Sequence, residues 1–202
     1  MSGPCMGNEA MDGAVILVRH GEPALSRRVT LTAAGYRDWW AKYEAGGLKA
    51  GQSPPDALVS MVQSAGTVFS STRERSRESA AAITGGRPFS SLDIFIEAAL
   101  PSPPCPGWFR LSPRWWGVVS RLWWRLFDYH DGQESWSQAE TRAESAANIL
   151  TERASAGQDV VLVAHGYFNF MIGRALAARG WKRTRDQGFK YWSARRFEPP
   201  GR

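Results

Sequence analysis

Short apolar runs alternate with longer amphipathic segments along most of the chain. Runs such as Val160 to Ala164 are rich in β-branched residues and stop at polar loops, which is typical of buried strands in a parallel sheet. On this pattern we expect strands at 14–18, 67–70, 92–97, 160–164 and 191–197, the last at a sheet edge because it carries two arginines. Helical spacing predicts helices at about 33–45, 57–62, 72–84, 138–156 and 168–178. Strands that alternate with helices predict a three-layer α/β/α sandwich with a mostly parallel sheet.

Two of the predicted helices carry a capping signal at their start. Ser71 and Glu74 have the spacing of a capping box, and so do Ser137 and Glu140. The first box places Arg75 in the first turn of its helix, where a cation is unfavourable beside the positive end of the helix dipole. An anionic group near Arg75 would offset this repulsion.

Residues 101–136 interrupt the alternation of strands and helices. A proline-rich lead-in comes first, and Ser112 with Pro113 is a favourable helix start. The helix that follows is rich in tryptophan and places these apolar residues on one face: Trp115, Val118, Val119, Leu122 and Leu126. We interpret the segment as an inserted helical lid that packs on the domain over the site. A basic amphipathic helix on a membrane, or a face that binds a partner or a second copy, remains open for residues 108–127.

Composition indicates one globular domain. Of the 202 residues, 43% are hydrophobic and 22% are charged, which suits a single folded domain over residues 13–202 behind a flexible tail at 1–12. Cys5 and Cys105 are too few for a disulfide framework or a zinc site. No apolar stretch reaches the roughly 18 residues of a transmembrane helix, and we expect a reduced, cytoplasmic protein.

The net charge of +6 is uneven, because the first hundred residues are balanced and the excess lies in the second half. A basic surface favours anionic partners. Charge alone does not choose among phosphate esters, nucleic acid and an anionic membrane surface. Peripheral membrane contact through 108–127 is the further option, and oligomeric state cannot be read from the sequence.

The candidate chemistry lies at two strand ends. His20 and His165, two of the three histidines, each follow an apolar strand and precede a glycine. The carboxyl ends of strands in an open α/β sheet are where ligands bind. Phosphoryl transfer needs cationic donors around the equatorial oxygens and an in-line nucleophile, which Arg19, Arg75 and the two histidines would supply if the strands are neighbours.

Four short motifs follow one another along the chain. They are Arg19-His20-Gly21-Glu22, Leu31-Thr32-Ala33-Ala34-Gly35, the run Ser71 to Arg75 continuing to Glu78-Ser79-Ala80, and Val163-Ala164-His165-Gly166. The set resembles the histidine phosphatase superfamily, which includes phosphoglycerate mutases and many broad-specificity phosphatases. The resemblance extends from Val15 to Phe197, with 101–136 as the divergent part, and it implies a phosphoglycerate mutase-like fold.

The resemblance also implies roles for individual residues. His20 would attack phosphorus and become phosphohistidine, while Arg19, Arg75 and His165 would hold the phosphoryl oxygens. The cationic pocket would help keep His20 neutral. The resemblance implies no cofactor and no metal.

A carboxylic acid would protonate the leaving oxygen. In the family it commonly follows the third strand, which selects Glu97; Glu22, beside the nucleophile and otherwise a phosphate-site residue, is the runner-up. The sequence after Glu97 departs from the family's glycine-rich continuation, so the substrate stays open. The resemblance thus implies metal-independent phosphomonoester hydrolysis, with a small-molecule or phosphoprotein phosphate ester as the partner and no nucleic acid. A phosphoglycerate mutase-type phosphotransferase and a weakly catalytic anion- or membrane-binding protein are the alternatives.

Overall fold

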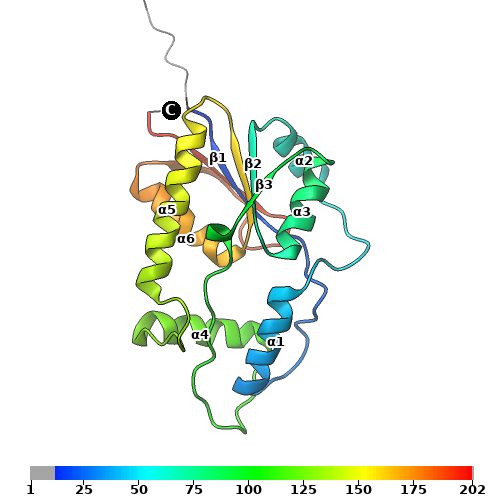
Figure 1. The fold of residues 1–202 in the computed structure, drawn as a ribbon, viewed down its shortest axis with the longest axis vertical. Coiled ribbons are helices and arrows are strands. Elements are labelled where there is room, and N and C mark those ends of the chain that lie inside the picture. The colour runs from blue at the N-terminus through cyan, green and yellow to red at the C-terminus, as the bar shows by residue number, and fades with distance from the viewer. Residues whose placement is uncertain (1–11, 202) are drawn as a thin grey trace, which may run out of the picture.

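A six-stranded sheet forms the centre of the protein in a computed structural model that describes residues 12–201 (Figure 1). The strand order is β3-β2-β4-β1-β6-β5; β1 to β4 run parallel to one another, and β6 runs antiparallel to both of its neighbours, β1 and β5. The strands are β1 Val15–Arg19, β2 Thr67–Ser71, β3 Ser90–Leu92, β4 Val160–Ala164, β5 Lys182–Asp186 and β6 Ala194–Glu198. The predicted tail at 1–12, apart from Asp12, and Cys5 lie outside the described residues.

Helices cover both faces of the sheet. They are α1 Ala33–Ala45, α2 Asp56–Gln63, α3 Glu74–Thr84, α4 Pro113–Phe127, α5 Trp136–Ala154 and α6 Gly166–Ala178. Alternate residues of β1 point to opposite faces. Ile16 therefore packs in the core beneath α2 and α3, and Leu17 packs in the core beneath α5 and α6. The predicted three-layer sandwich with a mostly parallel sheet is confirmed.

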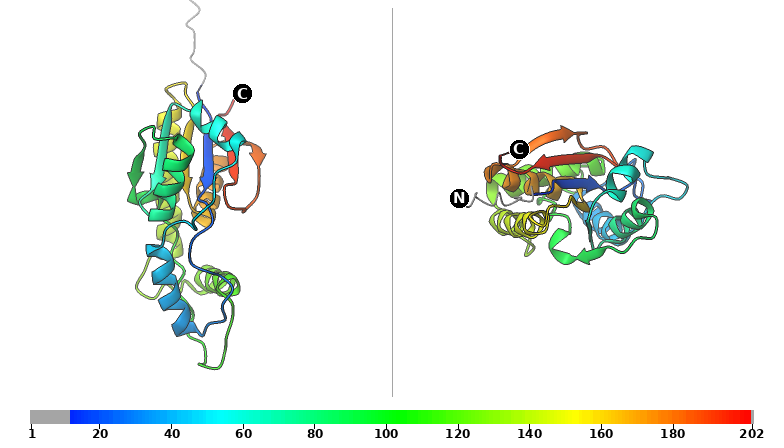
Figure 2. Two further views of the ribbon diagram at one scale, coloured as in Figure 1. Left: turned by 90° about the vertical axis from the view of Figure 1, so that its right-hand side faces the viewer. Right: turned by 90° about the horizontal axis from the view of Figure 1, so that it is seen from above.

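Helices α1 and α4 extend beyond the carboxyl ends of the parallel strands, as Figure 1 and the left view of Figure 2 show. They share a small core of their own, built on Tyr36, Trp39, Tyr43 and Trp116. The indole nitrogen of Trp116 donates to the Leu31 carbonyl at 2.8 Å, which ties α4 to the loop before α1. The two helices thus form a wall at the end of the sheet where the histidines lie.

The prediction of a strand at 92–97 is wrong. The strand β3 ends at Leu92, and Asp93–Phe95 forms a 3-10 helix. The Thr72 hydroxyl donates to the Asp93 carboxylate at 2.6 Å where the chain leaves the sheet. Phe95 is then fully buried in the α5 core, so its apolar character reflects packing of a turn rather than a strand.

The strand predicted at 191–197 exists as β6, but the prediction that it lies at a sheet edge is wrong. The strand β6 begins at Ala194 and lies between β1 and β5, and the edge is the unpredicted β5, whose residues are all polar and exposed. The arginines of β6 are tolerated inside the sheet because they form ion pairs: Arg195 with Asp186 at 3.0 Å, and Arg196 with Asp159 at 2.6 Å.

Both predicted capping boxes are misplaced. Ser71 belongs to β2, and Arg73 is the N-cap of α3 without a side-chain cap bond. The second box exists two residues earlier, where the Ser135 and Gln138 side chains each bond the other residue's backbone N–H. A serine near a helix start can have another partner, and Ser71 does, as described below.

Helix α4 packs as a wall, but its most apolar face points to solvent. Trp116, Gly117, Ser120 and Trp124 are buried, whereas the face that carries Trp115, Leu122 and Leu126 is exposed. Among residues 12–201, no helix is long and apolar enough to cross a membrane.

Candidate active site

The two histidines meet because β1 and β4 are neighbouring parallel strands. Arg19 is paired with Ala164 in the sheet, and the His20 backbone N–H donates to the Ala164 carbonyl at 3.0 Å. The ring centroids of His20 and His165 are 5.2 Å apart. Both side chains are almost completely buried, at 2% and 0% exposure. The structure therefore brings together the two histidines that the sequence singles out.

One nitrogen of His20 is committed to the backbone. The Nδ1 atom lies 2.7 Å from the Gly21 carbonyl oxygen, which can only accept, so Nδ1 carries the proton. In the neutral imidazole this leaves the lone pair on Nε2. Burial lowers the pKa of His20 well below its ordinary range, and the charges of Arg75 and Arg19 lower it further. His20 is thus held as a neutral imidazole with a nucleophilic Nε2.

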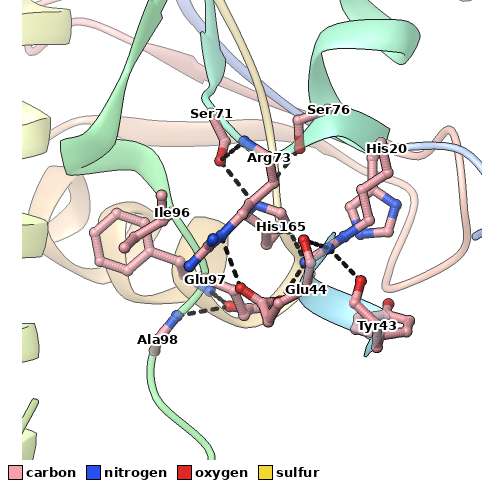
Figure 3. A network of polar contacts seen from close by, with 12 residues as sticks. His20, Tyr43, Glu44, Ser71, Arg73, Ser76, Ile96, Glu97, Ala98 and His165 are labelled. Atoms are coloured by element: carbon pink, nitrogen blue, oxygen red, sulfur yellow. Dashed lines mark hydrogen bonds and ion pairs between the residues drawn. The ribbon is translucent and has the colours of Figure 1, made fainter. Parts of the chain in front are cut away.

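His165 is fixed through both ring nitrogens. Arg75 Nη2 donates to Nδ1 at 3.2 Å, so Nε2 carries the proton and donates to the Ser71 hydroxyl at 2.9 Å. Ser76 lies at 3.5 Å from the same nitrogen (Figure 3). Burial and the Arg75 charge lower the pKa of His165 as well. The hydroxyl of Ser71, predicted as a helix cap, instead fixes the orientation of this ring.

Arg75 is a fully buried cation at the junction of α1 and α3. Its guanidinium donates to the Tyr43 carbonyl at 2.8 Å and to the Glu44 carboxylate at 2.6 Å. These groups belong to the C-terminal turn of α1, the negative end of that helix. The anion expected beside Arg75 is therefore Glu44, reinforced by the carbonyls at the end of α1.

Sequence reasoning missed Glu44 and Tyr43. Glu44 also forms an ion pair with Arg73 at 2.8 Å, and the Arg75 guanidinium lies 4.6 Å from the Tyr43 ring centroid. Nothing in the spacing of Glu44 marks it, because only the fold brings the end of α1 to the start of α3. The one available signal was the unfavourable position of Arg75, which required an anion but did not say which.

Arg19 lies over the start of α6. Its guanidinium donates to the Phe189 carbonyl and stacks on the Tyr191 ring at 4.4 Å. A Cβ atom at Gly166 would lie 3.2 Å from Arg19 Nε, so glycine after His165 allows this close approach. Tyr191 also lies near the nucleophile, with its ring centroid 5.9 Å from that of His20, and it too was missed from sequence.

The two carboxylate candidates occupy different places. Glu97 accepts hydrogen bonds from the backbone N–H of Phe168 at 2.8 Å and of Ala98 at 3.2 Å, which brings it to the first turn of α6 beside His165 (Figure 3). The Glu22 side chain is 53% exposed and pairs with Lys49 at 3.5 Å. The structure therefore groups Glu97, but not the Glu22 side chain, with the histidine and arginine cluster.

A cleft of about 400 Å³ opens beside this cluster. Its lining contains four arginines and one carboxylate, together with aromatic side chains. The residues are Arg19, Arg27, Tyr36, Trp40, Tyr43, Glu97, Leu100, Arg114, Gly117, Val118, Arg121, Gly166, Tyr167 and Phe189. Among residues 12–201, no three His, Cys, Asp or Glu side chains are grouped so that they could hold a metal ion.

Several buried guanidinium donors in and around the site lack a protein partner. Arg19 Nε and Arg75 Nε have no hydrogen bond within residues 12–201, and the same is true of Arg27 Nε and Arg121 Nε in the cleft wall. An unsatisfied buried N–H on a cation is costly, and an anionic oxygen would satisfy it strongly. The arrangement thus combines a neutral nucleophilic imidazole with guanidinium donors suited to a phosphoryl group.

Comparisons with known proteins bear on the family and the fold of the chain. The sequence model of the histidine phosphatase superfamily (branch 1) matches residues 15–200. A comparison with curated proteins gave no match.

Solved structures show the same fold at low sequence identity. An open reading frame product of Mycobacterium tuberculosis is 19% identical, with 94% of this chain and 97% of that chain covered and a TM-score of 0.57. A phosphoserine phosphatase of Entamoeba histolytica is 12% identical, with 82% and 80% covered and a TM-score of 0.56. A phosphoglycerate mutase of Bacillus anthracis is 15% identical, with 85% and 84% covered and a TM-score of 0.50.

Proposed function

Because the chain belongs to the histidine phosphatase superfamily, we propose that it hydrolyses phosphate monoesters through a phosphohistidine formed on His20. The observation that carries this proposal is the state of the His20 ring. Its Nδ1–H is held by the Gly21 carbonyl, and its pKa is lowered by burial and by two arginines. Such a ring is a neutral nucleophile over a wide pH range.

In the proposed first step, His20 Nε2 attacks phosphorus and the ester oxygen leaves. Glu97 donates a proton to that oxygen, so the alcohol departs neutral. The new N–P bond leaves a positive charge on the imidazole. The hydrogen bond from Nδ1–H to the Gly21 carbonyl stabilises this charge. The unpartnered Nε donors of Arg19 and Arg75 meet the phosphoryl oxygens, and His165 lies beside them.

In the second step, water attacks the phosphohistidine. The Glu97 carboxylate accepts a proton from that water, and the N–P bond breaks to release phosphate and neutral His20. Two backbone N–H groups hold one Glu97 oxygen, so the carboxyl group keeps its orientation in both steps. Neither step needs a metal ion.

The cleft supports a substrate larger than a three-carbon acid. Arg27, Arg114 and Arg121 line it in addition to the arginines assigned to the phosphoryl group. Aromatic rings form much of the remaining wall. We therefore expect an ester whose alcohol part is flat or apolar and carries further negative charge.

The proposal is tested by phosphate release from p-nitrophenyl phosphate and a panel of phosphate esters, with EDTA present. The native protein should be active, and His20→Ala should lose about 10³-fold or more in kcat. His130→Ala is the matched control, because His130 is the third histidine and lies in the loop between α4 and α5. Equal activity of His20→Ala and native protein would exclude the proposed nucleophile.

A phosphotransferase would use the same first step but pass the phosphoryl group to a second hydroxyl. The structural neighbours include both phosphatases and a phosphoglycerate mutase, so the fold does not separate the two. Following the phosphate by phosphorus NMR does. Inorganic phosphate as the product supports hydrolysis, and an isomeric ester would identify a mutase.

A further inference from the structure

Helix α4 exposes an unusual amount of apolar surface. Six of its large hydrophobic side chains are exposed, among them Leu126 at 69%, Phe127 at 63% and Trp115 at 59%. We call these six the apolar face of α4: Trp115, Val118, Leu122, Trp123, Leu126 and Phe127. A contiguous apolar surface of this kind on a protein marks an interaction site.

The fold holds this face outward. Trp116 and Trp124 on the opposite side of α4 are fully buried, and their indole N–H groups donate to the carbonyls of Leu31 and Glu134. Turning the helix to bury its apolar face would expose both tryptophans and break both hydrogen bonds. The apolar face therefore cannot be covered by a simple rotation of α4.

The charge along α4 is positive. From Ala98 to Phe127 the chain carries four arginines and no acidic residue, and the exposed Asp128 follows at the end of the helix. Arg110, Arg114 and Arg125 are exposed beside the face. A second copy of this chain on the same face would bring these like charges together, so the surface does not favour self-association. It complements an anionic surface instead.

The shape and composition of the face fit a lipid surface. A single exposed helix is convex and offers no groove for a partner side chain. Tryptophan and arginine are residues that lie well at a bilayer interface, with their apolar parts among acyl chains and their polar ends at the headgroups. Amphipathic helices of this kind lie in the interface plane.

We propose that the apolar face of α4 docks the protein on an anionic phospholipid bilayer. The side chains of Leu122, Leu126 and Phe127 would enter the acyl boundary, and the flanking arginines would meet anionic headgroups. Arg114 and Arg121 on the adjoining side of α4 line the cleft. Docking would therefore place the mouth of the cleft next to the headgroup layer, whichever reaction the site performs.

Vesicle flotation with the full chain tests this proposal without any measurement of activity. Native protein should float with vesicles that contain phosphatidylglycerol. Its partitioning onto vesicles of phosphatidylcholine alone should be weaker by a factor of about ten or more. The triple variant Leu122→Ser/Leu126→Ser/Phe127→Ser should lose at least about tenfold in partitioning onto the anionic vesicles. Leu92→Ser is the matched control, because Leu92 is an exposed leucine at the far edge of the sheet.

Thermal unfolding of the triple variant should match that of native protein, since the substituted side chains are exposed. Tryptophan fluorescence of native protein should shift to shorter wavelength on anionic vesicles. Native protein that stays unbound, or a triple variant that binds as native does, would overturn the proposal. Self-association of native protein that the triple variant abolishes, without flotation, would overturn it in favour of a second copy.

Discussion

The histidine site buries polar groups, whereas helix α4 exposes apolar ones, so each region departs from the usual pattern in its own way. At the strand ends, His20, Arg75 and His165 are polar groups with almost no solvent exposure. On α4, Leu126 and Phe127 are apolar groups with most of their surface exposed. Each departure costs free energy, and each lies beside the same cleft.

The two regions compensate for that cost differently. In the site, every buried imidazole has a hydrogen-bond partner, and the Arg75 charge is met by Glu44 and by the end of α1. On α4, no described side chain covers the outward face enough to bury it. A buried polar cluster is thus stabilised within the chain, whereas the exposed apolar face needs a surface outside it. This difference suggests how to separate chemistry from docking.

Arg75→Leu should have the largest effect on both stability and activity. Removing the cation leaves the Glu44 carboxylate and the His165 Nδ1 atom without that partner, which should cost about 3 kcal/mol or more in the free energy of unfolding. Phosphatase activity should fall about 10³-fold. Arg77→Leu, on the same helix but exposed, should change both by little. Urea unfolding and phosphate release measure the two effects.

The double variant Arg75→Leu/Glu44→Leu separates stability from activity. Removing both charges should restore part of the stability, because no unpaired buried charge remains, while activity stays low. If Arg75→Leu proves as stable as Arg77→Leu, the buried network does not compensate Arg75 as described.

Two adjacent tryptophans test which side of α4 packs on the protein. Trp116→Ala removes a fully buried ring and its hydrogen bond, and it should cost about 3–5 kcal/mol in the free energy of unfolding. Trp115→Ala removes an exposed ring and should cost about 0.5 kcal/mol or less. Urea unfolding of the pair decides this. The opposite order would mean that α4 packs on the protein through the side that carries Trp115.

The activity of Glu97→Gln on esters with different leaving groups tests whether Glu97 is the general acid. The amide oxygen can still accept from the Phe168 N–H, so the orientation should persist while the transferable proton is lost. We expect about a 10²-fold loss of kcat for an alkyl phosphate and a much smaller loss for p-nitrophenyl phosphate, which leaves without protonation. Glu22→Gln is the matched control. A leaving-group-dependent loss in Glu22→Gln alone would move the role to Glu22.

Lowering the pH should lower the free energy of unfolding, because two histidines are buried in the neutral form. The pKa values of His20 and His165 are lowered on folding, so the unfolded chain binds protons below its ordinary histidine pKa of 6.5 while the folded chain does not. Stability is therefore fully present above about pH 6.5 and is lost below it, by about 1.4 kcal/mol per pH unit for each histidine.

Urea unfolding from neutral pH to about pH 5.5 measures this loss. The double variant His20→Asn/His165→Asn should show a flatter dependence, whereas His130→Asn should follow native protein. A native protein whose stability does not change over this range would contradict the burial of two neutral histidines.

Much of the fold, and the placement of His20 and His165 at the strand ends, could be predicted from sequence because both depend on local patterns. Fully apolar runs such as Val160 to Ala164 have few alternatives to a buried strand, and their polar ends mark the site. Glu44 and Tyr191 could not be found this way, since they reach the histidines only through the packing of distant segments. Strand β5 was missed because its exposed, charged residues carry no apolar pattern.

Helix α4 shows where an apolar pattern alone is insufficient. Its start at Pro113 could be predicted, but the apolar pattern did not say which side of the helix packs on the protein. Trp116 and Trp124 provide enough buried area and hydrogen bonding to fix the other side, with Gly117 and Ser120 allowing close approach.

The most direct measurement is the phosphoryl state of the protein during turnover. Native protein would be mixed with a phosphate ester, quenched in base within milliseconds and analysed by intact mass and peptide mapping. The account predicts one added phosphoryl group, stable to base and labile to acid, located on His20 and absent from His20→Ala. Turnover with no phosphorylated protein, or a phosphoryl group on another residue, would contradict it.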